Sequence, residues 1–314
     1  MADILYIVVP CYNEQSVLPI SAPALMQKLE DYISSGRVSP ESSILFVNDG
    51  SQDETWNRIR DLHKKNLRFK GISLSHNAGE QNAYLAGMFA AVQTADVVIT
   101  TDCDLQDDIN AMDGMLDAYE KGNEIVYGVR NIREKESFLH RNNAGLFYRL
   151  MSVCGSELPP EHSQYRLMSK RAIEMLADYG EVNLFIPALV PMLGLKSATV
   201  YYRRTERAAG KTNYSVKKLI RLAVMAVTSF SAAPLILITL FAVLCGVLSI
   251  ISLIALIVFS VKDGAFNVLM CVLTAVFFVG AGLAVGMRIL GEYLFKNYME
   301  TKHRPRYHIA DTTD

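Results

Sequence analysis

The chain has 314 residues, of which 51% are hydrophobic and 20% charged, and its formal net charge at pH 7 is −1. This length allows one large domain or two ordinary ones. The balanced charge gives no sign of a nucleic-acid partner or of an acidic tail. The 5 cysteines have neither metal-ligand spacing nor the pattern of a disulfide framework, which is consistent with a reducing compartment.

Strand and helix patterns alternate along the N-terminal part of the chain. Apolar runs predict strands at 4–9, 43–47, 69–74 and 97–101, and the spacing after each predicts helices at about 16–33, 52–64, 80–94 and 108–121. Such repeated strand-helix units predict a parallel sheet, and the loops at the carboxyl ends of its strands form a ligand-binding edge.

An acidic stretch at 102–108, Asp-Cys-Asp-Leu-Gln-Asp-Asp, directly follows the fourth apolar run. We expect a buried parallel strand that delivers Asp102 and Asp104 to the ligand-binding edge. Alternate residues of an extended chain point the same way, so Asp102, Asp104 and Gln106 are candidate oxygen ligands of one hard divalent cation. The alternative interpretation is an acidic, solvated turn that caps the next helix.

After the acidic stretch, the pattern predicts strands at 124–127, 165–169 and 198–203, a helix at 170–179 and a polar helical segment at 134–150. A basic loop at 204–214 then leads into a segment in which Lys217, Lys218 and Arg221 alternate with apolar residues. We expect this segment to be a helix lying on a membrane surface, with an ordinary amphipathic helix as the alternative.

Two long apolar segments, 235–260 and 268–290, each exceed the roughly 20 residues that a helix needs to cross a bilayer. A short turn joins them, so they predict a transmembrane hairpin, and a pair of buried core helices is the alternative. Basic residues flank both outer ends of the hairpin, which places both chain termini in the cytoplasm by the positive-inside tendency. The apolar run at 4–9 is too short for a signal peptide.

Six motifs follow one another in order. They are Val9-Pro10-Cys11-Tyr12-Asn13-Glu14, the stretch 47–55 (Val-Asn-Asp-Gly-Ser-Gln-Asp-Glu-Thr), Asp102 to Asp107, Gly128-Val129-Arg130, Tyr165 to Ser169, and Arg207 to Tyr214. The first four resemble the inverting family-two glycosyltransferases with a GT-A fold. The last two, with two membrane segments behind them, narrow the resemblance, so that the whole chain is similar to the polyprenyl-phosphate glycosyltransferases, namely dolichyl-phosphate mannose synthases and bacterial bactoprenol glucosyltransferases.

The resemblance implies an α/β fold with a mainly parallel sheet, organised as a cytoplasmic GT-A domain at 1–213, an interfacial helix at 214–230, two transmembrane helices within 231–295 and a cytoplasmic tail at 296–314. It implies a multi-pass enzyme of the inner membrane, assembled as a homotetramer. The implied reaction is inverting transfer of a sugar from a nucleotide diphosphate sugar, UDP-glucose or UDP-N-acetylglucosamine, to undecaprenyl phosphate for cell-envelope glycans.

Two alternatives remain beside this reaction. One is an enzyme of the dolichyl-phosphate mannose synthase type that uses GDP-mannose. The other is a non-catalytic nucleotide-sugar-binding subunit or scaffold of a membrane glycan assembly complex. A processive polysaccharide synthase is disfavoured, because it would carry a Gln-x-x-Arg-Trp motif, whereas the single tryptophan, Trp56, lies in an early predicted helix.

The resemblance also assigns roles to residues. It implies a nucleotide-sugar pocket of Pro10, Tyr12, Glu14, Asp49 and Asp102, a Mg²⁺ or Mn²⁺ site of Asp102, Asp104 and Gln106, acceptor-phosphate contacts from Arg130, Arg141, Arg207, Lys211 and Thr212, and catalytic roles for Asp104, Gln164 and Arg166. Asp49 and Asp53 equally suit a turn and a helix cap, and for Asp53 the cap is favoured.

Two positions depart from the family pattern. Many relatives have Asp directly before the aromatic-Arg pair, where this chain has Gln164, and glutamine cannot take a proton. A phosphate nucleophile is already ionised near neutral pH, so a positioning role for Gln164 suffices, with Glu161, His162 or Asp104 as alternative bases. Asn213 stands where relatives often have Lys, and Lys211 is the candidate replacement for that charge.

Overall fold

The computed structural model describes residues 2–130, 162–180, 186–202 and 268–313. These residues fall into two compact units. The first is an α/β unit, which takes in the N-terminal strands and helices together with the C-terminal residues from Arg304 onward. The second unit contains the long helix α10 (Val268–Thr301).

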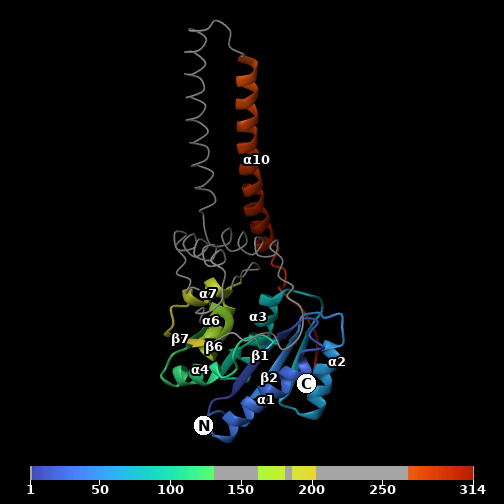
Figure 1. Cartoon of the computed structure of the whole chain (residues 1–314), viewed down its shortest axis with the longest axis vertical. Coiled ribbons are helices and arrows are strands. Elements are labelled where there is room, and N and C mark those ends of the chain that lie inside the picture. Colours follow the sequence, from blue (N-terminus) through green and yellow to red (C-terminus); the bar gives the residue numbers. More distant parts are fainter. Residues whose placement is uncertain (1, 131–161, 181–185, 203–267, 314) are drawn as a thin grey trace. The chain divides into compact units, whose positions relative to one another are not determined.

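The α/β unit contains every other described element (Figure 1). In chain order these are β1 (Leu5–Cys11), α1 (Leu18–Ser34), β2 (Ser43–Asn48), α2 (Thr55–Lys65), β3 (Phe69–Leu74), α3 (Glu80–Ala91), β4 (Val97–Thr100), α4 (Ala111–Glu120), β5 (Ile125–Arg130), β6 (His162–Ser169), α6 (Lys170–Ala177), α7 (Ile186–Met192), β7 (Ser197–Tyr202) and β8 (Ile309–Thr312).

The strands form one eight-stranded sheet in the order β7-β5-β6-β4-β1-β2-β3-β8. The neighbours β1–β2, β1–β4, β2–β3 and β5–β7 are parallel, whereas β6 runs antiparallel between β4 and β5, and β8 runs antiparallel to β3. The prediction of a mainly parallel sheet is therefore confirmed. Because β5 and β7 run in the same direction as β4, the carboxyl ends of β1, β2, β4, β5 and β7 all lie along one edge.

Both faces of the central strands are buried, as their continuous apolar runs require. Leu5, Ile7 and Val9 of β1 belong to the core cluster that contains side chains of α1, α2 and α4. The alternate residue Val8 faces α3, where a Cβ on Gly87 would lie 2.3 Å from Val8 Cγ1. The sheet is thus the middle of three layers, and the absence of a side chain at Gly87 allows α3 to pack closely.

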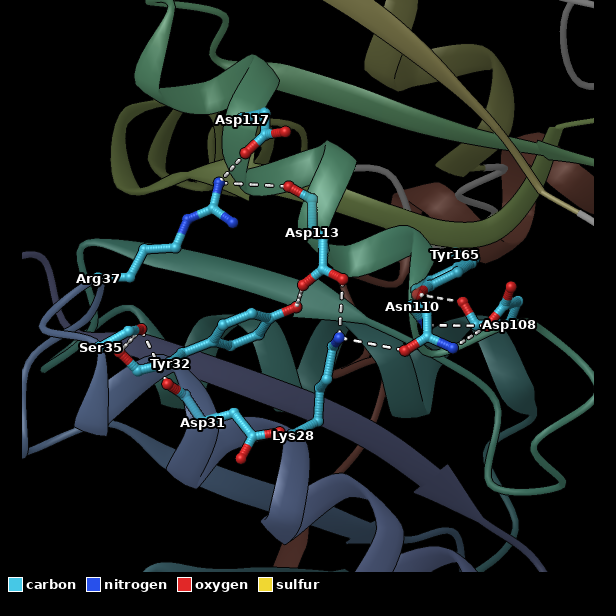
Figure 2. A network of polar contacts seen from close by, with 10 residues as sticks. All are labelled: Lys28, Asp31, Tyr32, Ser35, Arg37, Asp108, Asn110, Asp113, Asp117 and Tyr165. Atoms are coloured by element: carbon cyan, nitrogen blue, oxygen red, sulfur yellow. Dashed lines mark hydrogen bonds and ion pairs between the residues drawn. The ribbon is translucent and has the colours of Figure 1, made fainter.

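Polar contacts join α1 to α4 (Figure 2). Asp113 receives hydrogen bonds from Lys28 Nζ (2.8 Å) and from the Tyr32 hydroxyl (2.7 Å), and Lys28 also donates to Asn110 Oδ1 (3.2 Å). Arg37, just beyond α1, donates to the Asp113 carbonyl at 3.3 Å. These bonds fix the start of α4 and hence the end of the loop that carries the acidic stretch.

The predicted strands and helices of the N-terminal part are all present, within a few residues of the expected bounds. Two elements were not predicted, α7 and the edge strand β8. Asp311 of β8 accepts a hydrogen bond from Trp56 Nε1 of α2 (3.0 Å), and Thr313, just after β8, accepts one from the Gly71 backbone amide (2.9 Å). These bonds place the C-terminus beside α2 (Figure 1).

Helix α10 covers the second predicted membrane segment and continues beyond it. Its part Phe278–Thr301 is long and apolar enough to cross a membrane, and it is the one such helix among the described residues. The first predicted span (235–260), the interfacial helix (214–230) and the polar segment at 134–150 lie outside the described residues. The two-helix hairpin therefore remains a prediction.

Candidate active site

The loops that follow β1 and β2 are cross-linked at the carboxyl edge of the sheet. Asn13 N donates to Ser51 Oγ (3.0 Å), Gln52 N donates to Asn13 Oδ1 (2.9 Å), and Glu14 N donates to Thr55 Oγ1 (2.9 Å). Asn13 has φ +56°, a left-handed conformation that Asn tolerates better than most residues. The two loops therefore form one rigid wall of the site.

Asp53 strengthens the same wall. Its carboxylate accepts hydrogen bonds from the Thr55 backbone amide (3.0 Å) and from the Gln15 amide (3.2 Å). Thr55 is the first residue of α2 and Glu54 takes its N-cap position, so Asp53 is not the cap that the sequence favoured and instead supports the helix start from one residue before it.

Three predicted pocket residues lie on or beside this wall. Tyr12 is 43% exposed, and Pro10 and Glu14 are half-buried. An exposed aromatic side chain at the end of β1 is available to pack on a planar ring. This arrangement agrees with a nucleotide pocket and leaves the individual contacts as predictions.

Asp49 lies at the end of β2 and is buried. Its two carboxylate oxygens accept hydrogen bonds from the backbone amides of Ala78 (2.7 Å) and Gly79 (3.1 Å), just before α3. Burial raises the pKa of Asp49, and these two bonds partly offset the rise. Asp49 thus joins the β2 loop to the β3 loop, and each carboxylate oxygen keeps a second lone pair for a ligand.

Gly50 makes this junction possible. Its φ is +62°, and a Cβ at this position would lie 2.4 Å from the backbone carbonyl carbon of His76. Only glycine fits such a close backbone approach in this conformation.

Asp102 is partly buried beyond the end of β4, and its Oδ1 accepts a hydrogen bond from the Tyr84 hydroxyl of α3 at 2.5 Å. Burial, followed by the negative charges of Asp107 and Glu80, raises the pKa of Asp102 to about 7. Tyr84 opposes that rise. A carboxylate held among like charges in this way is stabilised by a bound cation.

Asp104 is buried, and its Oδ1 accepts a hydrogen bond from the backbone amide of Gln106 at 3.1 Å. The chain here is not extended as we expected, because β4 ends at Thr100 and Leu105 has φ +53°. The acidic stretch is therefore a turn, and the alternation argument that placed Asp102, Asp104 and Gln106 on one side was wrong, since a turn does not keep a period of two.

The donor set suits a hard divalent cation in its chemistry, since Asp102 and Asp104 supply carboxylate oxygens and Gln106 an amide oxygen. Within the described ranges, no group of three or more His, Cys, Asp or Glu residues is arranged to hold a metal ion. Two carboxylates are enough when a diphosphate supplies further oxygens, as is usual for Mg²⁺. Asp102 and Asp104 therefore fit Mg²⁺ or Mn²⁺ shared with a nucleotide diphosphate.

A second polar cluster lies farther along the same edge and was not predicted as a unit. Asp107, 2% exposed, accepts a hydrogen bond from the Tyr202 hydroxyl at 2.7 Å and pairs with Arg130 Nη2 at 3.4 Å. Arg130 Nε also donates to the Tyr202 oxygen at 3.2 Å. Although burial acts against its charge, Asp107 raises the pKa of Arg130, which stays protonated. No local sequence pattern indicates a pairing between residues so far apart.

Gln164 and Arg166 stand in β6, next to β4. Arg166 is almost fully buried, and burial lowers its pKa to about 10. Its Nη2 donates to Gln164 Oε1 at 2.9 Å, and the Thr100 hydroxyl donates to the Gln164 carbonyl. Gln164 therefore holds the Arg166 guanidinium close to the end of β4, and the predicted role of Gln164 in positioning the acceptor phosphate stays a prediction.

The remaining predicted acceptor contacts, Arg141, Arg207, Lys211 and Thr212, lie outside the described residues, as does the alternative base Glu161. Of the acceptor-phosphate group, the described part of the chain contains Arg130 alone. The edge of the sheet thus brings together Asp49, Asp102, Asp104 and Arg130, with Gln164 and Arg166 behind β4.

The sequence model of Glycosyl transferase family 2 matches residues 6–176, and the chain belongs to this family of enzymes. It is 40% identical to the uncharacterized glycosyltransferase YkoT of Bacillus subtilis (strain 168), over 98% of this chain and 91% of that protein. It is 31% identical to the prophage bactoprenol glucosyl transferase homolog of Escherichia coli (strain K12), over 96% and 97%. Identity to the bactoprenol glucosyl transferase of Shigella phage SfX is also 31%, with the same coverage.

Proposed function

We propose that this glycosyltransferase moves a sugar from a nucleotide diphosphate sugar to undecaprenyl phosphate, with inversion at the anomeric carbon. UDP-glucose is the first candidate donor and UDP-N-acetylglucosamine the second. The observation that carries the proposal is the pair of carboxylates, Asp102 and Asp104, which lie just beyond the carboxyl end of the central parallel strand β4, where the Tyr84 hydroxyl and the Gln106 amide orient them. The bactoprenol glucosyl transferases named above, similar over nearly the whole chain, support the choice of acceptor.

The donor occupies the carboxyl edge of the sheet. The wall formed by the β1 and β2 loops, with Asp49 behind it, holds the nucleoside, and Asp102 and Asp104 lie at the diphosphate. Mg²⁺ or Mn²⁺, when bound, neutralises the charge that develops on the leaving nucleoside diphosphate. Tyr84 keeps Asp102 oriented through its hydrogen bond.

The acceptor phosphate attacks the anomeric carbon from the side opposite the leaving diphosphate. It is already ionised near neutral pH, so no side chain has to remove a proton from it. Arg130, whose side chain is 29% exposed, orients this phosphate, since a guanidinium matches phosphate geometry. Arg166 adds positive charge behind the end of β4, held there by Gln164.

We further propose a multi-pass protein of the inner membrane with both termini in the cytoplasm. The apolar part of α10 is long enough to span a bilayer, and Lys302, Arg304 and Arg306 follow it, as the positive-inside tendency requires. Gly280, Gly282 and Gly286 in α10 permit close helix contact, which suits a homotetramer.

The proposal is tested by incubating purified full-length protein with undecaprenyl phosphate, Mg²⁺ or Mn²⁺ and a panel of radiolabelled UDP and GDP sugars, and by counting label in the organic extract. One UDP sugar is expected to label the lipid only when metal is present. Asp104→Ala should abolish labelling, and Asp108→Ala, which removes a partly exposed acid from the same loop, should retain most of it. Labelling from GDP-mannose alone would replace the proposed donor, and labelling by Asp104→Ala would contradict the proposed site.

A further inference from the structure

Asp107 lies on the carboxyl edge of the sheet, and the proposed reaction assigns it no role. Its Oδ1 accepts a hydrogen bond from Tyr202 (2.7 Å) and faces Arg130 Nη2 (3.4 Å). Its Oδ2 is buried and has no hydrogen-bond partner among the described residues. A buried carboxylate oxygen that lacks a donor is costly, so such atoms in native proteins call for an explanation.

The position of Asp107 along the edge indicates what the missing donor is. The loops of β1 and β2 lie on one side of β4, whereas Arg130 at the end of β5 and Tyr202 at the end of β7 lie on the other. A nucleotide sugar that places its nucleoside at β1 and β2 and its diphosphate at Asp102 therefore extends its sugar toward β5. Asp107 is held at that end of the edge by Arg130 and Tyr202.

Asp107 follows Asp104 by three residues in the same loop, so it lies close to the diphosphate position. Among the described residues it does not join Asp102 and Asp104 in a three-carboxylate metal site. A carboxylate here repels phosphate, so its natural partner on a bound donor is a sugar hydroxyl, which supplies a hydrogen to Oδ2.

We infer that Asp107 is a sugar-binding residue, whose Oδ2 accepts a hydrogen bond from one hydroxyl of the donor sugar while Tyr202 and Arg130 hold its Oδ1. This inference rests on the proposed use of a nucleotide sugar and deepens it, because it names a residue that recognises the sugar itself. The bond forms with no transfer of a proton, since the sugar hydroxyl keeps its hydrogen.

The test measures binding, which needs no lipid acceptor and so fails separately from the proposed transfer reaction. Isothermal titration with Mn²⁺ present compares UDP, UDP-glucose and UDP-N-acetylglucosamine on unmodified full-length protein and on Asp107→Asn. Asparagine keeps the shape and the oxygen facing Tyr202, but its amide lacks the charge at Oδ2. We expect Asp107→Asn to weaken binding of the preferred UDP sugar about tenfold or more, and binding of UDP by less than twofold.

Two further measurements make the result specific. The first uses a set of UDP-glucose analogues, each lacking one sugar hydroxyl. One analogue should bind the unmodified protein at least about tenfold more weakly than UDP-glucose does, and in Asp107→Asn the affinities for this analogue and for UDP-glucose should be nearly equal. Tyr202→Phe removes the donor to Oδ1 and leaves Oδ2 intact, so its effect on that discrimination should be the smaller one. Unchanged affinity for UDP shows that each variant is folded.

Three results would overturn the inference. Equal weakening of UDP and of the UDP sugar by Asp107→Asn would mean that Asp107 acts on the metal-diphosphate end. Unmodified protein that binds UDP and both UDP sugars equally would leave no sugar contact to assign. Discrimination among the analogues that persists in Asp107→Asn would place the sugar contact on another residue.

Discussion

The acid Asp102 is predicted to destabilise the metal-free protein as the pH rises. Its pKa is about 7 in the folded state, against 3.8 for an ordinary aspartate. Between these values the folded protein binds the proton more tightly than the unfolded chain, so the free energy of unfolding falls as the pH rises through this window. At about 1.4 kcal/mol per pKa unit, the full loss is at most about 4 kcal/mol, and water at the partly exposed carboxylate reduces it.

Asp102→Asn removes this ionisation and keeps an oxygen that accepts the hydrogen bond from Tyr84. Without metal, the variant should therefore be more stable than the unmodified protein at pH 8, although it has lost activity. The advantage should grow by about 2 kcal/mol between pH 5 and pH 8, which corresponds to roughly 5 °C in melting temperature for a domain of this size.

The assay is thermal unfolding of detergent-solubilised protein in EDTA, followed by intrinsic fluorescence at pH 5, 6, 7 and 8. Asp108→Asn, a change in the same loop, is the matched control and should show no comparable trend. Adding Mn²⁺ with UDP at pH 8 should raise the melting temperature of the unmodified protein and leave Asp102→Asn nearly unchanged. A difference between Asp102→Asn and the unmodified protein that is the same at pH 5 and pH 8 would refute the reasoning.

Three further predictions concern single contacts. Gly50→Ala should lower the free energy of unfolding by several kcal/mol, because the added Cβ would lie 2.4 Å from the backbone of His76. Gly36→Ala, where φ is +72° but no atom lies within 4 Å of the added Cβ, should lower it by about 1 kcal/mol, and denaturant titration of both variants measures the difference. Burial acts to raise the pKa of Asp113, but hydrogen bonds from Lys28 and Tyr32 hold this pKa below its ordinary value. Asp113→Asn should therefore lower the free energy of unfolding at pH 7, and this loss should shrink on acidification toward pH 3, so equal losses at both pH values in denaturant titration would contradict the reasoning. Tyr84→Phe removes a hydrogen bond that lowers the pKa of Asp102, so the Mn²⁺ affinity measured with UDP should fall at pH 7 and recover toward pH 8.5, and a loss independent of pH would argue against the role of Tyr84.

All strands of the sheet except β8 were predictable from the sequence, because each is a short apolar run that ends in polar residues. The same local signal located Asp49, Asp102 and Asp104, since all three lie within a few residues of the end of such a run. Strand direction was less accessible. The segment of β6 looks like the others, and it is antiparallel because of a long-range choice of partners that no local pattern records.

The parts that sequence reasoning missed depend on contacts between distant residues or on weak patterns. Asp107 reads as one more acid in a loop until Tyr202, 95 residues later, is placed against it. The sequence pattern predicts Tyr84 to be a core residue of α3, and the role of its hydroxyl becomes clear only from its hydrogen bond to Asp102. The edge strand β8 has four exposed residues, Ile-Ala-Asp-Thr, so its apolar signal was too small to find.

The position of β8 affects the order in which the protein can fold during synthesis. The edge of β3 acquires its partner only after α10 and the residues that follow it have been made. Until then the ribosome-bound chain presents an unpaired strand edge, which is prone to pair with other chains. The sheet can therefore be completed only after the apolar segment of α10 has been synthesised. A tag fused directly after Thr313 would hinder pairing of β8 with β3, whereas a tag before Asp3 would not.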